Sequence, residues 1–103
     1  MSYRHSIGYL TTTAQDIYHA KVSRSTIASV VVCNTSGANT SYSIWHVPAD
    51  EDQNDVHALF YETAIKAKNT QVIEVPIVLD VGDKITALAA AGSAVVLTLY
   101  VED

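Results

Sequence analysis

Hydrophobic and polar residues alternate along several short segments of this chain. In residues 94–102 the face that we expect to be buried carries Val95, Leu97, Leu99 and Val101. In residues 72–79 the corresponding face carries Ile73, Val75, Ile77 and Leu79. A period of two in β-branched and aromatic residues is typical of strands, so both segments are predicted strands. Pro76 cannot donate a ladder hydrogen bond, which places its strand at a sheet edge or at a bulge.

Other segments predict further strands. Residues 26–34 are apolar on both faces, which suits a sheet that is covered on both sides. In residues 41–47 we expect Tyr42 and Ile44 to point inward and Trp45 outward. The segment Thr35–Asn39 contains Gly and Asn, which accept a positive φ, so it predicts a hairpin between its flanking strands. The remaining candidate strands are residues 14–20, 57–65 and 84–89.

Roughly seven or eight short strands at regular spacing are the pattern of a sandwich or jelly roll. We therefore predict an all-β protein, a two-layer antiparallel β-sandwich that is jelly-roll-like, with residues 14–103 as one domain. Residues 1–13 lack a clear alternation, and we expect them to form an extended N-terminal arm. Within this arm, Tyr3, Arg4 and Tyr9 are the candidates for contact with a neighbouring subunit.

Composition narrows the classes of function. A chain of 103 residues with 49% hydrophobic residues has enough apolar surface for one core, and the excess indicates contact with another subunit. The net charge is −5 and the six Lys and Arg residues are scattered, which argues against nucleic-acid binding. No apolar run approaches the roughly 20 residues of a membrane span, and no signal peptide is visible, so we expect folding in the cytoplasm. The single cysteine, Cys33, excludes an internal disulfide and is expected to be a buried thiol.

The four histidines invite a metal site or a catalytic base. None of His5, His19, His46 and His57 stands at a ligand spacing such as HxH or HxxxH. A sandwich could still bring His46 and His57 together across the loop between them. Since a metal site needs several convergent ligands, we favour partly exposed histidines at strand ends, and we predict no metal and no cofactor.

The acidic loop PADEDQND begins at Pro48. Asp50, Asp52 and Asn54 reproduce the first three oxygen ligands of a calcium loop. Asp55, however, stands where the turn requires Gly, and the twelfth position lacks the bidentate Glu. We interpret the segment as a solvated loop tip, and a looser cation loop formed by Asp50, Asp52 and Asp55 stays open as the alternative.

Catalytic motifs are missing from the sequence. There is no GxSxG, CxxC or GxxxxGK[ST], so we predict no catalytic residues and no enzyme. The remaining clue is a group of outward-facing apolar and aromatic side chains, Trp45, Val96, Thr98 and Tyr100. Subunit interfaces are enriched in aromatic residues and depleted of charge, and we expect these four to form a self-association surface. The alternative is that they are scattered surface hydrophobes.

Five stretches also carry a family resemblance: LTTT from Leu10, IY from Ile17, IASVVVCNTSG from Ile27, WHVP from Trp45, and VLDVGDKI from Val78. Their order and spacing resemble small β-sandwich virion proteins of tailed bacteriophages. The resemblance implies a structural role in the virus particle, as a capsid decoration or cement protein that stabilises the shell by bridging neighbouring capsid subunits. The alternative that it implies is a tail- or neck-associated adaptor that binds a host-surface glycan or another tail protein.

The same resemblance implies the partners. They would be the major capsid protein or other virion proteins, and the chain itself would form a homotrimer or another homo-oligomer in the virion. No nucleic acid and no membrane are expected as partners. In the adaptor alternative, Trp45 and Tyr42 together with the acidic loop would form the ligand site.

Overall fold

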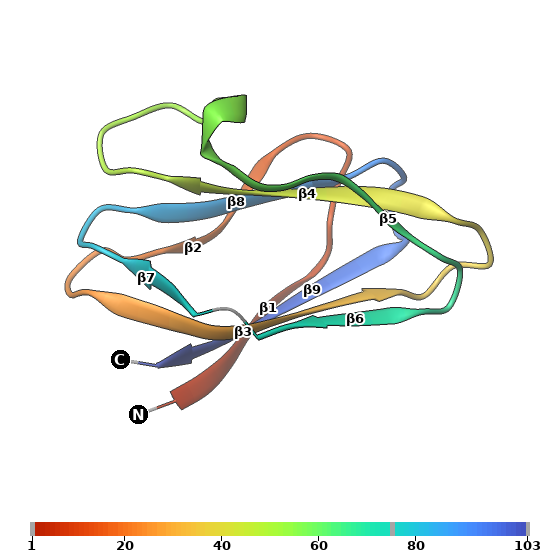
Figure 1. Cartoon of the computed structure of the whole chain (residues 1–103), viewed down its shortest axis with the longest axis horizontal. Helices are drawn as coiled ribbons and strands as arrows, with labels where there is room; N and C mark the ends of the chain where they lie inside the picture. The colour runs from red at the N-terminus through yellow and green to blue at the C-terminus, as the bar shows by residue number, and fades with distance from the viewer. Residues whose placement is uncertain (1, 75, 103) are drawn as a thin grey trace.

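A computed structural model of the chain describes residues 2–74 and 76–102. These residues form nine strands and one short 3-10 helix, in the order β1 (Ser2–Tyr9), β2 (Gln15–His19), β3 (Ser25–Asn34), β4 (Thr40–Val47), η1 (Asp55–His57), β5 (Ala58–Ile65), β6 (Thr70–Ile73), β7 (Ile77–Leu79), β8 (Lys84–Ala89) and β9 (Val95–Glu102). The strands form two antiparallel sheets that lie over each other as two layers (Figure 1).

The strand order is that of a jelly roll. Sheet A has the order β1-β9-β3-β6, and sheet B has the order β2-β8-β4-β5. The short strand β7 pairs with the first residues of β3, and β6 pairs with later residues of the same strand. The chain passes to the other sheet after most strands, so that each sheet contains strands from both ends of the sequence. Two such interleaved sheets define the jelly-roll architecture. The prediction of an all-β, two-layer antiparallel sandwich is confirmed.

The core fills the space between the two sheets. In β9, the four predicted inward residues Val95, Leu97, Leu99 and Val101 are all 0% exposed. Tyr42 and Ile44 of β4 also point inward, as predicted, and each is 1% exposed. Burial of one such aliphatic side chain contributes roughly 1.5–3 kcal/mol, so the alternating strands alone supply a rigid scaffold.

Residues 2–9, which we expected to form part of an arm, instead form the edge strand β1. This strand pairs with β9 along its length. Leu10, which follows it, is 0% exposed, and its N–H donates to the carbonyl of Val95 at 2.8 Å. The chain therefore joins the sandwich from its first described residue, because β9 offers unpaired backbone groups on that side. Met1, which the predicted arm includes, lies outside the described residues.

The segment Thr35–Asn39 does not form the predicted hairpin. β3 belongs to sheet A and β4 to sheet B, so the segment crosses between the layers. The buried side chain of Asn34 fixes this crossing: its Nδ2 donates to the carbonyls of Ala38 at 2.8 Å and Ile65 at 3.2 Å. Its Oδ1 accepts from the N–H of Ser36 at 3.0 Å. The polar residues of this segment therefore stabilise a connection between the two sheets instead of a hairpin within one sheet.

The predicted strand 72–79 is divided into β6 and β7. Both pieces pair with β3 at the edge of sheet A, and Pro76 lies between them, so its predicted position at an edge is confirmed. Leu79 is 0% exposed, as the alternation requires. Val75, a further predicted inward residue, lies outside the described residues.

Candidate functional site

The outward side of sheet A is an apolar surface. We call this surface the outer face of sheet A, and it consists of the side chains of Val31, Cys33, Val72, Val78, Val96, Thr98 and Tyr100. The sheet register places Val31 directly between Thr98 and Val72, so the side chains form continuous rows across three strands. Val72 is 58% exposed and Tyr100 is 41% exposed. The predicted outward residues of β9 therefore share one face with apolar residues of β3, β6 and β7.

This face corrects one expectation about β3. Its apolar residues on both sides predicted a sheet that is covered twice, but Val31 and Cys33 on the outer side are partly exposed. Cys33 is thus a half-buried thiol, not the buried one that we expected. No segment within the described ranges covers the outer face of sheet A, so it is open to a partner.

The candidate arm residues lie beside this face. Arg4 is exposed and stands opposite Tyr100 in the register of β1 and β9. Tyr9 is 48% exposed, and its hydroxyl accepts a hydrogen bond from Thr35 Oγ1 at 3.4 Å. Tyr3 is paired with Val101 through its backbone, and its side chain lies outside what the structure describes.

Trp45, which we expected on the same self-association surface, lies on the other sheet and is only 3% exposed. Its side chain does point away from the core, but the loop between β4 and β5 and the helix η1 lie over the outer side of sheet B (Figure 1). The indole ring packs edge-to-face against Tyr61, with ring centroids 6.4 Å apart. Trp45 is therefore not part of an exposed self-association surface, and the prediction of its exposure is wrong.

Hydrogen bonds around η1 hold this covering loop in place. The N–H of Val56 donates to Asn54 Oδ1 at 3.1 Å, and the N–H of Asn54 donates to Nδ1 of His57 at 3.2 Å. Because Nδ1 accepts, the proton of the neutral ring is on Nε2, which donates to Glu51 Oε1 at 3.3 Å. The reciprocal pair is a capping box, which satisfies donors at the start of the short helix.

The acidic loop forms no cation site. Within residues 2–74 and 76–102, no three His, Cys, Asp or Glu side chains lie close enough together to hold a metal ion. The carboxylates of Asp50, Asp52 and Asp55 therefore do not form a cluster that could hold a cation. The alternative of a cation loop is not supported.

Asp83 joins two loops at one end of the sandwich. Its carboxylate accepts from His46 Nε2 at 3.0 Å, from the N–H of Ala49 at 2.9 Å and from the N–H of Asp80 at 3.1 Å. Burial by itself would raise the pKa of Asp83, but these hydrogen bonds and the charge of His46 outweigh it, so the pKa lies below its ordinary value. His46 is bonded to Asp83 and His57 to Glu51, so the structure does not show the joint His46–His57 site, which was the less favoured reading of the sequence.

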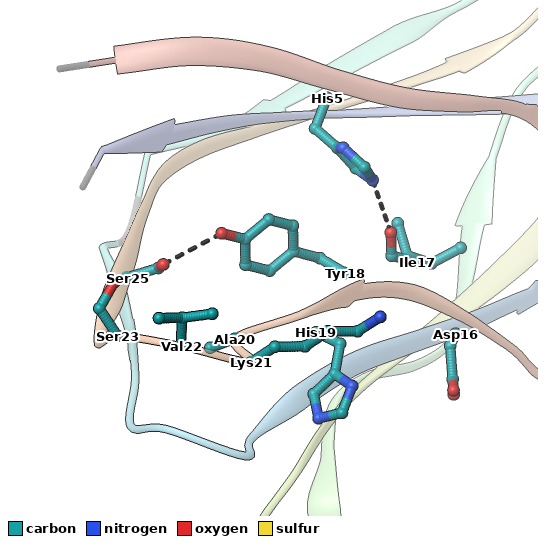
Figure 2. A pocket seen from close by; sticks show the side chains of 10 residues that line it. All are labelled: His5, Asp16, Ile17, Tyr18, His19, Ala20, Lys21, Val22, Ser23 and Ser25. Atoms are coloured by element: carbon teal, nitrogen blue, oxygen red, sulfur yellow. Dashed lines mark hydrogen bonds between the residues drawn. The ribbon is translucent and has the colours of Figure 1, made fainter.

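A groove of about 620 Å³ follows the free edge of β2 (Figure 2). His5, from β1, donates from Nε2 to the carbonyl of Ile17 at 2.7 Å and packs edge-to-face on Tyr18. The hydroxyl of Tyr18 is 3.0 Å from Ser25 Oγ, on the far side of the groove. Figure 2 shows these two hydrogen bonds, which link β1 to β2 and the end of β2 to the start of β3 across the seam between the two sheet edges.

Two groups of residues were missed by the sequence analysis. Tyr61 and Glu62 were used only as strand formers in residues 57–65, and nothing in the sequence marks them as neighbours of Trp45. Gly82 and Asp83 belong to the GD turn that contributes to the family resemblance. That turn could have been recognised as an anchor, because Gly favours positive φ and Asp bonds to nearby backbone N–H groups.

Comparisons with known proteins extend these observations. No family model matches the sequence, and no curated protein matches it. The fold is similar to a chain from Bacillus endospore appendages, described as a novel family of disulfide-linked pili, with a TM-score of 0.55 and 13% identity over 98% of this chain and 85% of that one. It is also similar to part of a chain from the T13 particle of infectious bursal disease virus, with a TM-score of 0.52 and 9% identity over 98% of this chain and 30% of that one.

At these identities the likeness establishes a common fold. Both neighbours come from extended assemblies, a pilus and a virus particle. Across the described part of the chain, no helix has the length and hydrophobicity needed to cross a membrane.

Proposed function

We propose that this protein is a non-enzymatic structural component of a virus particle, which assembles with further copies of itself and with neighbouring shell proteins. The observation that carries the proposal is a jelly roll with exposed apolar side chains on the outer face of sheet A. Jelly rolls are a common architecture of viral capsid domains. The two structural neighbours, from a pilus and a virus particle, support an assembly role.

The outer face of sheet A has the composition of a subunit interface. Aromatic residues are enriched and charged residues depleted at the centre of such interfaces. Here Tyr100 and Val72 are exposed, and charged residues lie at the margins of the face: Arg4 stands opposite Tyr100 on the edge strand β1, Glu74 directly follows β6, and Glu102 is the last residue of β9. Association through a face of this kind removes apolar area from water.

A network of disulfides that runs from subunit to subunit needs at least two cysteines in each subunit, and these 103 residues contain one. We therefore propose a homotrimer or another homo-oligomer held by the outer face of sheet A. In the specific form that the sequence resemblance suggests, this oligomer is a capsid decoration protein of a tailed phage and bridges subunits of the major capsid protein in the virion. Several weak contacts per oligomer then add up through avidity.

Sedimentation equilibrium at micromolar concentration tests the self-association step. We expect an oligomer for the native chain and at least tenfold weaker association for Val72→Glu, which introduces a charge into the face. Val56→Glu is the matched control, because Val56 is 85% exposed in η1, away from sheet A. A monomeric native chain, or equal effects of the two substitutions, would contradict the proposal.

Mass spectrometry of purified particles tests the position in the virion. A decoration protein is present in hundreds of copies, whereas the alternative, a tail or neck adaptor, is present in a few dozen copies or fewer. The adaptor alternative retains the outer face of sheet A as a contact with another tail protein. Its glycan site has lost its basis, because Tyr42 is 1% and Trp45 is 3% exposed.

A further inference from the structure

A second, smaller cavity lies on the outer side of sheet B, beneath the loop that covers it. It has a volume of about 240 Å³ and is lined by Ser43, Trp45, Gln53, Asp55, Tyr61, Glu62 and Leu88. Pockets for drug-sized ligands are commonly about 300–1,000 Å³, so this cavity suits a single side chain better than a cofactor or an oligosaccharide.

A bulge in β5 gives the cavity two adjacent side chains. One residue, Ser43, separates Tyr42 from Ile44, but two residues, Tyr61 and Glu62, separate their partners on β5. In a regular strand Tyr61 and Glu62 would point to opposite faces, whereas here both line the same cavity. The cavity thus combines an aromatic ring and a carboxylate from consecutive positions.

The electrostatic potential of the cavity is negative. Its lining contains two carboxylates, Asp55 and Glu62, and no Lys, Arg or His. The ion pairs formed among the described residues include neither of them. The charges of Asp55 and then Glu62 are the main reasons that the pKa of Tyr61 lies above its ordinary value. The cavity therefore has negative charge that no cation within the described chain balances.

Trp45 lines the cavity and supplies an independent indication of a ligand. Its side chain lines the cavity and is 3% exposed, yet the indole N–H has no hydrogen-bond partner. Burial of a donor without an acceptor costs about 1–3 kcal/mol, and such groups in folded proteins call for a water or ligand that completes them. The ring also packs edge-to-face against Tyr61, which is 52% exposed at the entrance.

These features select the class of ligand. A metal ion requires more ligands than two carboxylates, and the described residues contain no cluster of three ligating side chains. An organic cation fits better, since aromatic faces and carboxylates both attract it. Arginine fits best, because its planar guanidinium stacks on aromatic rings and donates to two carboxylates at once, and its residue also carries a carbonyl that can accept a hydrogen bond.

We propose that the cavity formed by Trp45, Tyr61, Asp55 and Glu62 binds an arginine side chain presented by a partner protein. The site lies on sheet B. It is therefore independent of the proposed assembly through the outer face of sheet A, and either can fail while the other holds.

Trp45 is the only tryptophan in the chain, so its fluorescence reports on the cavity directly. The titration uses N-acetyl-arginine methylamide, with the neutral isostere N-acetyl-citrulline methylamide and N-acetyl-lysine methylamide for comparison. For one capped residue we expect a dissociation constant on the order of 1 mM for the arginine compound. The citrulline compound should bind at least tenfold more weakly, and affinity should fall as salt rises, because the carboxylates are near the surface.

Asp55→Asn and Glu62→Gln should each weaken binding about fivefold or more. Asp52→Asn is the matched control, since it removes the same charge from the same loop outside the cavity, and it should change binding less than twofold. Unchanged melting temperatures confirm that each variant is folded. If Glu62→Gln does not fold, Asp55→Asn still tests the proposal.

The proposal is overturned if citrulline binds as tightly as arginine, or if no saturation appears below about 50 mM. It is also overturned if Asp52→Asn matches Asp55→Asn, which would indicate a diffuse charge effect. Equal binding of the lysine compound would reject the assignment to arginine.

Discussion

Replacement of Gly82 by alanine tests how tightly the loops at one end of the sandwich are packed. Gly82 has a φ of +94°, and its N–H donates to the carbonyl of Ala20 at 2.6 Å. A Cβ atom at this position would lie 2.7 Å from the Cβ of Ala49. Carbon atoms prefer separations of about 3.5–4.0 Å, so the substitution forces either the GD turn or the loop after β4 to move.

Two costs add up in Gly82→Ala. A left-handed conformation costs a residue with a Cβ about 1–2 kcal/mol. Overpacking at a tight contact costs roughly another 1–3 kcal/mol. The sum is about 2–5 kcal/mol. Since 1 kcal/mol shifts the melting temperature of a domain of this size by roughly 4–8 °C, we expect a fall of at least about 8 °C.

Thermal unfolding followed by circular dichroism measures this fall. Gly37→Ala is the matched control, because its Cβ would meet nothing within 4 Å. It should change the melting temperature by no more than about 3 °C. The double substitution Gly82→Ala with Ala49→Gly removes the close contact. When its melting temperature is compared with that of Ala49→Gly alone, the loss caused by Gly82→Ala should be about half as large. If Gly82→Ala shifts the melting temperature no more than Gly37→Ala does, the packing described for this turn is wrong.

Three further predictions follow from other contacts. The pKa of Asp83 is lowered in the folded state, so its carboxylate stabilises the fold above the ordinary pKa of 3.8, and this contribution is lost as pH falls through the lower folded-state value. Asp83→Asn should therefore cost about 1–3 kcal/mol in urea unfolding at pH 6, and the difference from the native chain should shrink below about pH 4; a constant difference would contradict it. Glu62→Gly should leave stability within about 0.5 kcal/mol, because Glu62 has a φ of +48° that glycine accepts, whereas Thr63→Gly next to it should cost about 1 kcal/mol; equal losses by thermal unfolding would argue against the bulge. Trp45 should show blue-shifted emission and weak quenching by iodide, and strong quenching would indicate that the covering loop is displaced.

The sequence predicted those parts of the fold that depend on alternation alone. Strand β9 and the inward positions of β4 follow from the spacing of apolar side chains, since a period of two fixes which residues share a face. The edge position of Pro76 followed from its missing N–H. The number and regular spacing of the short strands sufficed to predict two layers.

What the sequence did not predict depends on which strands pair. Thr35–Asn39 has the residues of a hairpin turn, but the partners of β3 and β4 are in different sheets, and only long-range pairing decides that. Residues 2–9 have a weak pattern and become a strand because β9 provides a template. The predicted outward orientation of Trp45 was correct, but its predicted exposure was wrong, because the loop between β4 and β5 covers it.

The two outer faces of the sandwich offer partners different kinds of contact. The outer face of sheet A is apolar, so association through it should persist or strengthen in high salt, since the hydrophobic contribution does not depend on charge. The outer side of sheet B carries the acidic loop and the cavity around Trp45, so binding there should weaken over the same range of salt. The response of each contact to salt therefore identifies the face that forms it, even where one partner touches both. A protein with two such faces can bind its own copies through one and a basic neighbour through the other, and the order of assembly then depends on ionic strength.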